Sequence, residues 1–141
     1  MSTRFFRIEE LVSRDLFNQY KNKPHYLWGL FDDRLLIPLD RLRERYGKCQ
    51  INNWVWEGSF QYSGFREPAC KIGAVLSQHR FGRAADLKFS DISPEAIRKD
   101  IKSNPDHKAF ELIRCVEENT PTWLHIDVRY HTGKGILWVP M

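Results

Sequence analysis

The chain lacks the features that mark several specialised protein classes. Its three cysteines, Cys49, Cys70 and Cys115, are odd in number, far apart and without a C-x-x-C pair. They therefore predict buried or free thiols, not a disulfide framework or a cysteine-based zinc site. No apolar run approaches the roughly 20 residues of a membrane-spanning helix, so we expect no membrane insertion. Internal repeats, low-complexity tracts and blocks of like charge are also absent.

What the chain does have indicates a globular protein. It contains 141 residues, 42% of them hydrophobic and 13% aromatic, which excludes a disordered chain and suits one domain. The net charge of +4 favours anionic surroundings such as cell-wall polymers, or reflects ordinary solubility. Positive and negative residues are interspersed, so we expect no nucleic-acid partner. Glu9 and Glu10 stand where a secretory signal would have its apolar core, which predicts cytoplasmic synthesis.

Apolar spacing predicts a helix at residues 6–20. Residues 35–38 lead into a second, short helix through Leu39, Leu42 and Tyr46, which Gly47 closes. Ser93 and Pro94 predict a third helix that runs to about residue 103. Alternating or β-branched segments predict strands at residues 51–56, 84–89, 110–117, 123–130 and 136–139. The expected fold is one α+β domain over residues 1–141, an antiparallel sheet with flanking helices. Residues 1–50 form its helical part, and residues 51–141 carry the sheet and the motifs.

Two imidazoles and a carboxylate are the most informative side chains. His79 and Asp86 lie seven residues apart around Gly82, and His125 follows downstream. Three such ligands would hold a catalytic Zn²⁺ ion with its fourth position open to water. The alternative is that His79 is a surface histidine, His125 a hydrogen-bonded core histidine, and Asp86 a cap or an ion-pair partner. Because side chains alternate along a strand, His125 and Asp127 share one face.

The order of these residues carries a resemblance. The pattern S-x-H-x-x-G-x-A-x-D at residues 77–86 is preceded by Ser-Gly-Phe-Arg at 63–66 and followed by W-x-H-x-D at 123–127. It resembles the zinc D-Ala-D-Ala carboxypeptidase and L-alanyl-D-glutamate endopeptidase family, which acts on bacterial peptidoglycan and includes phage endolysins. The resemblance covers about residues 51–139 and implies a fold shared with the Hedgehog signalling domain. It also implies His79, Asp86 and His125 as the metal ligands.

A peptidase also needs a general base. Several relatives have an acidic residue three positions before the last histidine ligand, where this chain has Thr122. Glu117 is the best replacement: across the hairpin predicted from residues 118–122, we expect it roughly opposite Trp123, on the face of His125. Glu118 is the alternative, although its expected place is the turn.

The remaining candidates concern the substrate. Arg66 resembles the family arginine that approaches the substrate, where it would bind a carboxylate or stabilise an oxyanion; a pair with Glu67 is the alternative. Ser77 would bind substrate or cap its loop. Asp127 would orient a ligand histidine, contact the substrate or complete the metal sphere.

The expected function is therefore zinc-dependent hydrolysis of a peptide bond in peptidoglycan. A compact phage lysis enzyme, monomeric and acting at the cell wall after release from the cytoplasm, fits this expectation. One rival is a zinc-stabilised binding domain without catalysis, which the Hedgehog relatives exemplify and the missing acid at Thr122 supports. The second rival is a basic nucleic-acid-binding accessory protein, which rests on charge alone.

Overall fold

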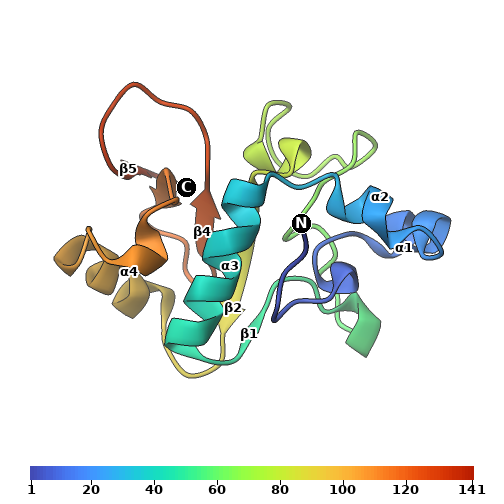
Figure 1. The fold of residues 1–141 in the computed structure, drawn as a ribbon, viewed down its shortest axis with the longest axis horizontal. Coiled ribbons are helices and arrows are strands. Elements are labelled where there is room, and N and C mark those ends of the chain that lie inside the picture. Colours follow the sequence, from blue (N-terminus) through green and yellow to red (C-terminus); the bar gives the residue numbers. More distant parts are fainter.

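The computed structural model describes all residues, 1–141, and shows an α+β fold (Figure 1). Four α-helices and a five-stranded mixed sheet are joined by loops and short 3₁₀ turns. The helices are α1 (Arg14–Tyr20), α2 (Pro24–Trp28), α3 (Asp33–Tyr46) and α4 (Pro94–Ser103). The strands are β1 (Cys49–Gln50), β2 (Ala84–Phe89), β3 (Cys115–Glu117), β4 (Leu124–Asp127) and β5 (Leu137–Val139). No helix has both the length and the apolar character needed to cross a membrane.

The expected antiparallel sheet is wrong at one edge. The strands lie in the order β1-β2-β4-β3-β5, and β5 pairs with β3 in parallel while the other pairs are antiparallel. Both sides of β4 are occupied by β2 and β3, so β5 joins the sheet at a free edge, next to β3. Because β5 starts after a return loop from the end of β4, it runs opposite to β4. It is therefore parallel to its neighbour β3.

Helix α3 packs in front of the sheet and supplies much of the core (Figure 1). Its buried apolar residues recur at helical spacing: Leu35, Leu36, Leu39 and Leu42. They join a core cluster of 24 buried residues that includes Leu87 of β2 and Ile126 of β4. Side chains alternate between the two faces along each strand. Asp86 precedes Leu87 and His125 precedes Ile126, so Asp86 and His125 lie on the other face of the sheet. The apolar layer thus fixes the strands that carry the candidate ligands.

Two predicted segments have a different structure. The helix expected at residues 6–20 is interrupted, because Ser13 accepts a hydrogen bond from the Leu16 amide at 3.2 Å and starts α1 there. The strand expected at residues 51–56 is largely a 3₁₀ turn, Trp54–Trp56. The Trp54 indole donates to the Val12 carbonyl at 2.8 Å. This hydrogen bond holds the tryptophan against the N-terminal segment and away from the sheet.

The other elements differ mainly in length. β2 and α4 have the predicted bounds, and the Ser93 hydroxyl accepts from the Ala96 amide at 3.1 Å as an N-cap. α3 is longer than the predicted short helix, because Asp32 caps the Arg34 amide and residues 35–38 are already helical. α2 was not predicted: Pro24, interpreted as an interruption, stands at the first helical position, which proline favours. β3, β4 and β5 are shorter than the predicted strands.

Candidate metal centre

The centre of the site is a cross-strand pair. The antiparallel register of β2 and β4 places Asp86 directly opposite His125, where side chains on one face approach closely. Asp86 Oδ1 lies 2.9 Å from His125 Nδ1. One step along the same face, Ala84 lies opposite Asp127, and its small side chain leaves space for the carboxylate.

His79 reaches the pair from a 3₁₀ turn, Gln78–Phe81, that ends at Gly82. Gly82 has a φ of 66°, and a Cβ there would overlap the Leu30 carbonyl. Only glycine fits this bend against the neighbouring chain. The turn brings His79 Nε2 to 3.4 Å from Asp86 Oδ1, and the two imidazole rings meet edge to face with centroids 5.2 Å apart.

The outer nitrogen of each histidine is already engaged by an acceptor. His79 Nδ1 lies 2.8 Å from the Gly64 carbonyl oxygen, and His125 Nε2 lies 2.9 Å from Asp127 Oδ2. An acceptor requires the facing nitrogen to carry the proton, so Gly64 and Asp127 hold the protons of His79 Nδ1 and His125 Nε2. The lone pairs that neutral imidazoles would offer to a metal ion therefore belong to His79 Nε2 and His125 Nδ1. These two nitrogens are the ones that face Asp86. The His79, Asp86 and His125 donor atoms lie within 4.8 Å of one another and can hold a metal ion.

Burial and charge favour a cation between these groups. His79 and His125 are only 2% and 5% exposed. Burial would lower the pKa of His125, but hydrogen bonds to Asp127 and Asp86 outweigh it and raise the pKa to about 9. For Asp86, its contacts with His125 and His79 overcome the opposing effect of burial and lower the pKa. A proton on His125 Nδ1 thus occupies the place that a metal ion would take, and metal binding would release it.

Asp127 contacts protein groups on several sides. Its side chain is fully buried. Besides contacting His125, it accepts hydrogen bonds from the Arg129 guanidinium, with Arg129 Nε 2.8 Å from Oδ1. The Arg129 amide also donates to Oδ1 at 3.1 Å. These contacts favour the role of orienting His125 over substrate contact, because little of the carboxylate is left to bind anything else.

Glu117 lies on the same face as His125, but its predicted partner was wrong by two residues. β3 and β4 pair Cys115 with Asp127 and Val116 with Ile126, and one further step places Glu117 beside His125 instead of Trp123. A register shift of two residues keeps a side chain on the same face of a strand, so the Glu117 side chain still reaches the site. Its Oε1 lies 3.9 Å from His125 Nδ1.

Glu118, the alternative base, points elsewhere. Its Oε1 lies 3.7 Å from Lys102 Nζ on α4, and it does not line the metal cavity. Thr122 is exposed in the loop before β4. Of the carboxylates considered as the base, Glu117 is the one that the fold brings to the site.

The two remaining candidates line the same cavity. Arg66 donates to the Tyr62 carbonyl at 2.8 Å, and its Nη2 lies 3.5 Å from Asp86 Oδ2. The alternative pair with Glu67 does not form, since that carboxylate accepts from the Ser13 hydroxyl at 2.7 Å. Ser77 caps the turn of His79, whose amide lies 3.4 Å from Ser77 Oγ.

The cavity has a volume of about 510 Å³ and gathers the predicted site residues from separate segments, except Asp127 and the alternative base Glu118. It also contains Gln78, whose side-chain oxygen is the one buried side-chain polar atom without a hydrogen-bond partner. Sequence reasoning missed Gln78 and the Gly64 carbonyl. Neither could be predicted from the sequence. Gln78 stands at a variable position of the motif, and the Gly64 contact is made by a backbone carbonyl, which every residue has.

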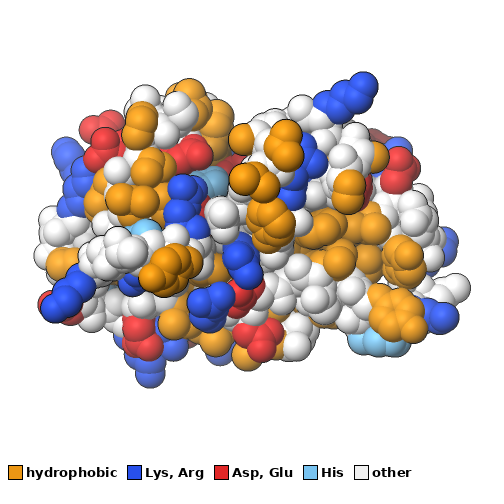
Figure 2. All heavy atoms as spheres, turned by 90° about the horizontal axis from the view of Figure 1, so that it is seen from above, with side chains coloured by type: hydrophobic (Ala, Val, Ile, Leu, Met, Phe, Trp, Pro, Cys, Tyr) orange, Lys and Arg blue, Asp and Glu red, His pale blue; other side chains and the backbone are white.

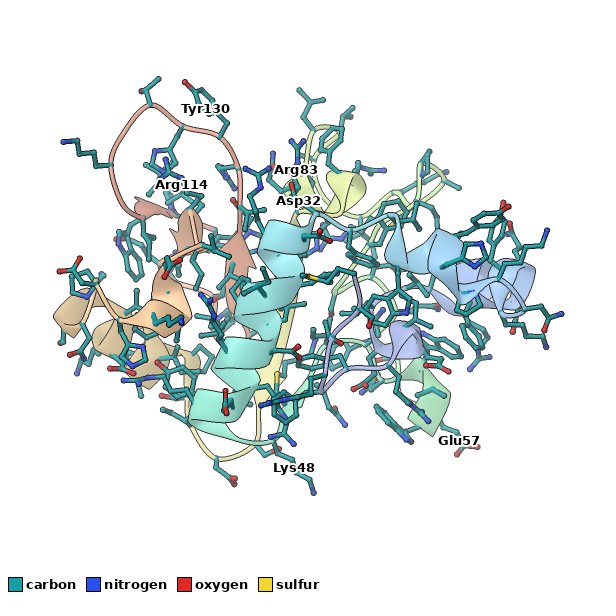
Figure 3. All side chains as sticks on the ribbon, viewed as in Figure 1. Asp32, Lys48, Glu57, Arg83, Arg114 and Tyr130 are labelled. Atoms are coloured by element: carbon teal, nitrogen blue, oxygen red, sulfur yellow. The ribbon has the colours of Figure 1, made fainter.

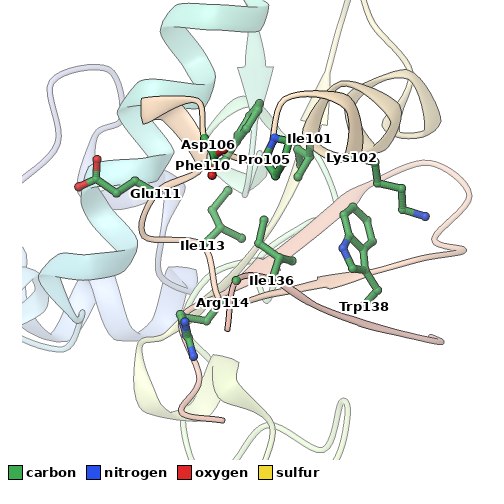
Figure 4. A pocket seen from close by; sticks show the side chains of 11 residues that line it. Ile101, Lys102, Pro105, Asp106, Phe110, Glu111, Ile113, Arg114, Ile136 and Trp138 are labelled. Atoms are coloured by element: carbon green, nitrogen blue, oxygen red, sulfur yellow. The ribbon is translucent and has the colours of Figure 1, made fainter. Parts of the chain in front are cut away.

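A second hollow, of about 530 Å³, lies between α4, the segment before β3, and β5 (Figure 4). Its lining includes Ile101, Ile113, Ile136 and Trp138. Asp106 and Glu111 are its only acidic residues, and it contains no histidine or cysteine. It has no group of side chains that could hold a metal ion.

Comparison with protein-family models, curated proteins and solved structures gave no match for this chain. The Hedgehog-type fold and the peptidase family therefore remain predictions from the motifs. What the structure adds is the convergence of His79, Asp86 and His125 at one buried point.

Proposed function

We propose that this protein is a zinc-dependent peptidase that hydrolyses peptide bonds of bacterial peptidoglycan. The observation that carries the proposal is the pair of histidines whose outer nitrogens are engaged, so that His79 Nε2 and His125 Nδ1 face Asp86. Two neutral imidazoles and one carboxylate are typical of catalytic zinc sites that keep a position free. The motifs at residues 63–66, 77–86 and 123–127 supply the substrate class through their resemblance.

A zinc ion held there would supply Lewis acidity toward water and the substrate carbonyl. Glu117 lies close enough to His125 to act as general base, taking a proton from water and passing it to the leaving amine. The Arg66 guanidinium lies beside Asp86 and lines the cavity. Its fixed positive charge would stabilise the negative charge that develops on the carbonyl oxygen. Asp127, held by Arg129, keeps His125 in one tautomer.

The substitution Glu117→Gln tests the assignment. It keeps the size of the side chain but removes the base, so we expect fragment release from purified peptidoglycan to fall about 10²–10⁴-fold. Zinc content, measured on the same samples, should equal that of the wild type. Mass spectrometry of the fragments would identify the bond that is cut. A wild type that releases no fragments, or a variant that releases them at the wild-type rate, would contradict the assignment.

One observation favours a second function. Thr122 stands where several relatives carry an acidic residue, and a protein that binds zinc without a base would be a binding domain of the same fold. Such a domain would bind zinc and peptidoglycan fragments and release no product. The fragment assay on the wild type separates the two functions directly.

A further inference from the structure

Two loops beside the metal cavity carry the most exposed large apolar side chains of the protein. Tyr130, Val75 and Leu76 are 87%, 82% and 75% exposed, and Met141 at the same cavity is 65% exposed. Figure 3 labels Tyr130 at the outer end of its loop. Figure 2 looks onto this side of the molecule and shows apolar and basic side chains interspersed around histidine and acidic groups.

The backbone of each loop is held by one arginine. Arg80 donates to the carbonyls of Cys70, at 2.7 Å, and Ala74, at 3.1 Å. In the other loop, Arg114 donates to the His131 carbonyl at 3.1 Å; Figure 3 labels this arginine beside the loop. The apolar side chains are therefore presented to solvent by an ordered backbone. Fixed exposure of this kind is typical of a surface that another molecule covers.

The two loops themselves carry charge of one sign, while Asp86 and Glu117 lie inside the adjoining cavity with Arg66. Residues 68–85 contain Lys71, Arg80 and Arg83 and no acidic residue, and residues 128–141 contain Arg129 and Lys134 and no acidic residue. Arg83 and Arg129 pair with Asp32 and Asp127. The other three, Lys71, Arg80 and Lys134, form no ion pair. The molecule that covers this surface should be anionic.

We propose that this surface, the tips of the loops at residues 71–76 and 130–134, adsorbs to an anionic lipid bilayer. The aliphatic side chains Val75 and Leu76 match hydrocarbon, whereas sugars and short polar peptides offer them little apolar area. Tyrosine favours the boundary between hydrocarbon and water, which suits Tyr130. Lys71 and Lys134 would meet lipid phosphates beside them. The contact needs no spanning helix, because side chains at loop tips reach only the headgroup boundary.

This surface borders the metal cavity, so adsorption would bring the cavity to the membrane surface. The inference goes beyond the proposed peptidase activity, because adsorption requires neither zinc nor a substrate. Lipid binding can be present or absent whatever the outcome of the fragment assay.

The test is co-sedimentation of the full chain with vesicles that contain phosphatidylglycerol, compared with vesicles of phosphatidylcholine alone. We expect the wild type to bind the anionic vesicles and to dissociate as salt is raised. The double variant Val75→Ser, Leu76→Ser should bind at least about tenfold more weakly, since it loses the apolar contact. Its unfolding temperature should be unchanged, because both side chains are largely exposed.

Trp56→Ser is the matched control, since Trp56 is 52% exposed and precedes Glu57, which Figure 3 labels far from Tyr130. This variant should bind as the wild type does. Failure of the wild type to bind anionic vesicles would overturn the proposal, and so would equal binding by the double variant. Binding to purified cell walls through Val75 and Leu76, without binding to vesicles, would assign the surface to a wall polymer and would also overturn it.

Discussion

Two hollows of this protein have nearly the same volume, about 510 Å³ at the metal centre and about 530 Å³ between α4 and β5. They differ in what their side chains do together. At the metal centre, the acceptors Gly64 and Asp127 fix two histidines toward one carboxylate. In the other hollow, charged groups border an apolar floor and do not converge. Convergent donor atoms, and not volume, therefore distinguish the candidate active site.

The largest expected difference between the hollows follows from removing a metal ligand. Asp86→Ala should lower zinc affinity more than 100-fold, beyond the effect of about 10–100-fold typical for partners outside the ligand set. Peptide hydrolysis should fall with it. Glu111→Ala removes a carboxylate from the other hollow and should leave zinc content unchanged. Zinc titration of both variants with a competing chelator measures the two affinities. Equal zinc affinities would contradict the assignment of Asp86 as a ligand.

A smaller effect is expected one contact away from the ligands. Asp127→Asn keeps the shape of the side chain but can present an N–H group to His125, which would disfavour the tautomer that the ligand needs. We expect zinc affinity to fall about 10–100-fold. Asp106→Asn, the same change in the other hollow, should have no effect. The same titration measures both variants. Unchanged zinc affinity in Asp127→Asn would show that Asp127 does not orient His125 for metal binding.

The smallest effect concerns stability near the second hollow. The hydrogen bond from Arg45 on α3, ahead of those from Tyr46 and Asn104, lowers the pKa of Asp100 on α4 to about 2. A lowered carboxyl pKa stabilises the fold above the unfolded value near 4, and this contribution is lost as the pH falls toward 2. With solvent screening, it is on the order of 1 kcal/mol.

Asp100→Asn should therefore be less stable than the wild type at pH 6 and approach it at pH 2–3. Urea unfolding at several pH values measures the difference. A difference that stays constant with pH would mean that the charge of Asp100 does not stabilise the contact between α3 and α4. Zinc affinity should be unchanged in this variant, which separates the structural contact from the metal centre.

Local signals determined the parts of the fold that could be predicted. β2 followed from alternation, and α4 followed from Ser93 and Pro94, because each signal acts within a few residues. The break at Ser13 was missed, since a serine within an apolar pattern reads equally well as a helical residue. Trp54 was placed in a strand by its propensity, but a hydrogen bond to Val12, distant in sequence, determines its structure. The parallel pairing of β5 likewise depends on which of the two sheet edges it joins.

In the candidate site, too, the features carried by sequence motifs were predicted and those that depend on the fold were not. The motifs predicted His79, Asp86 and His125 as a group, and the structure brings them together. The placement of Glu117 on the face of His125 agreed with the structure because strand alternation survives a two-residue error in register. The contact of Gly64 with His79 was not predictable, because its acceptor is a backbone carbonyl.

The most direct test of the central claim is a crystal structure with zinc added, with anomalous scattering recorded on both sides of the zinc absorption edge. We expect one strong anomalous peak within bonding distance of His79 Nε2, His125 Nδ1 and the Asp86 carboxylate. A peak bound elsewhere, or no peak at these three side chains, would contradict it.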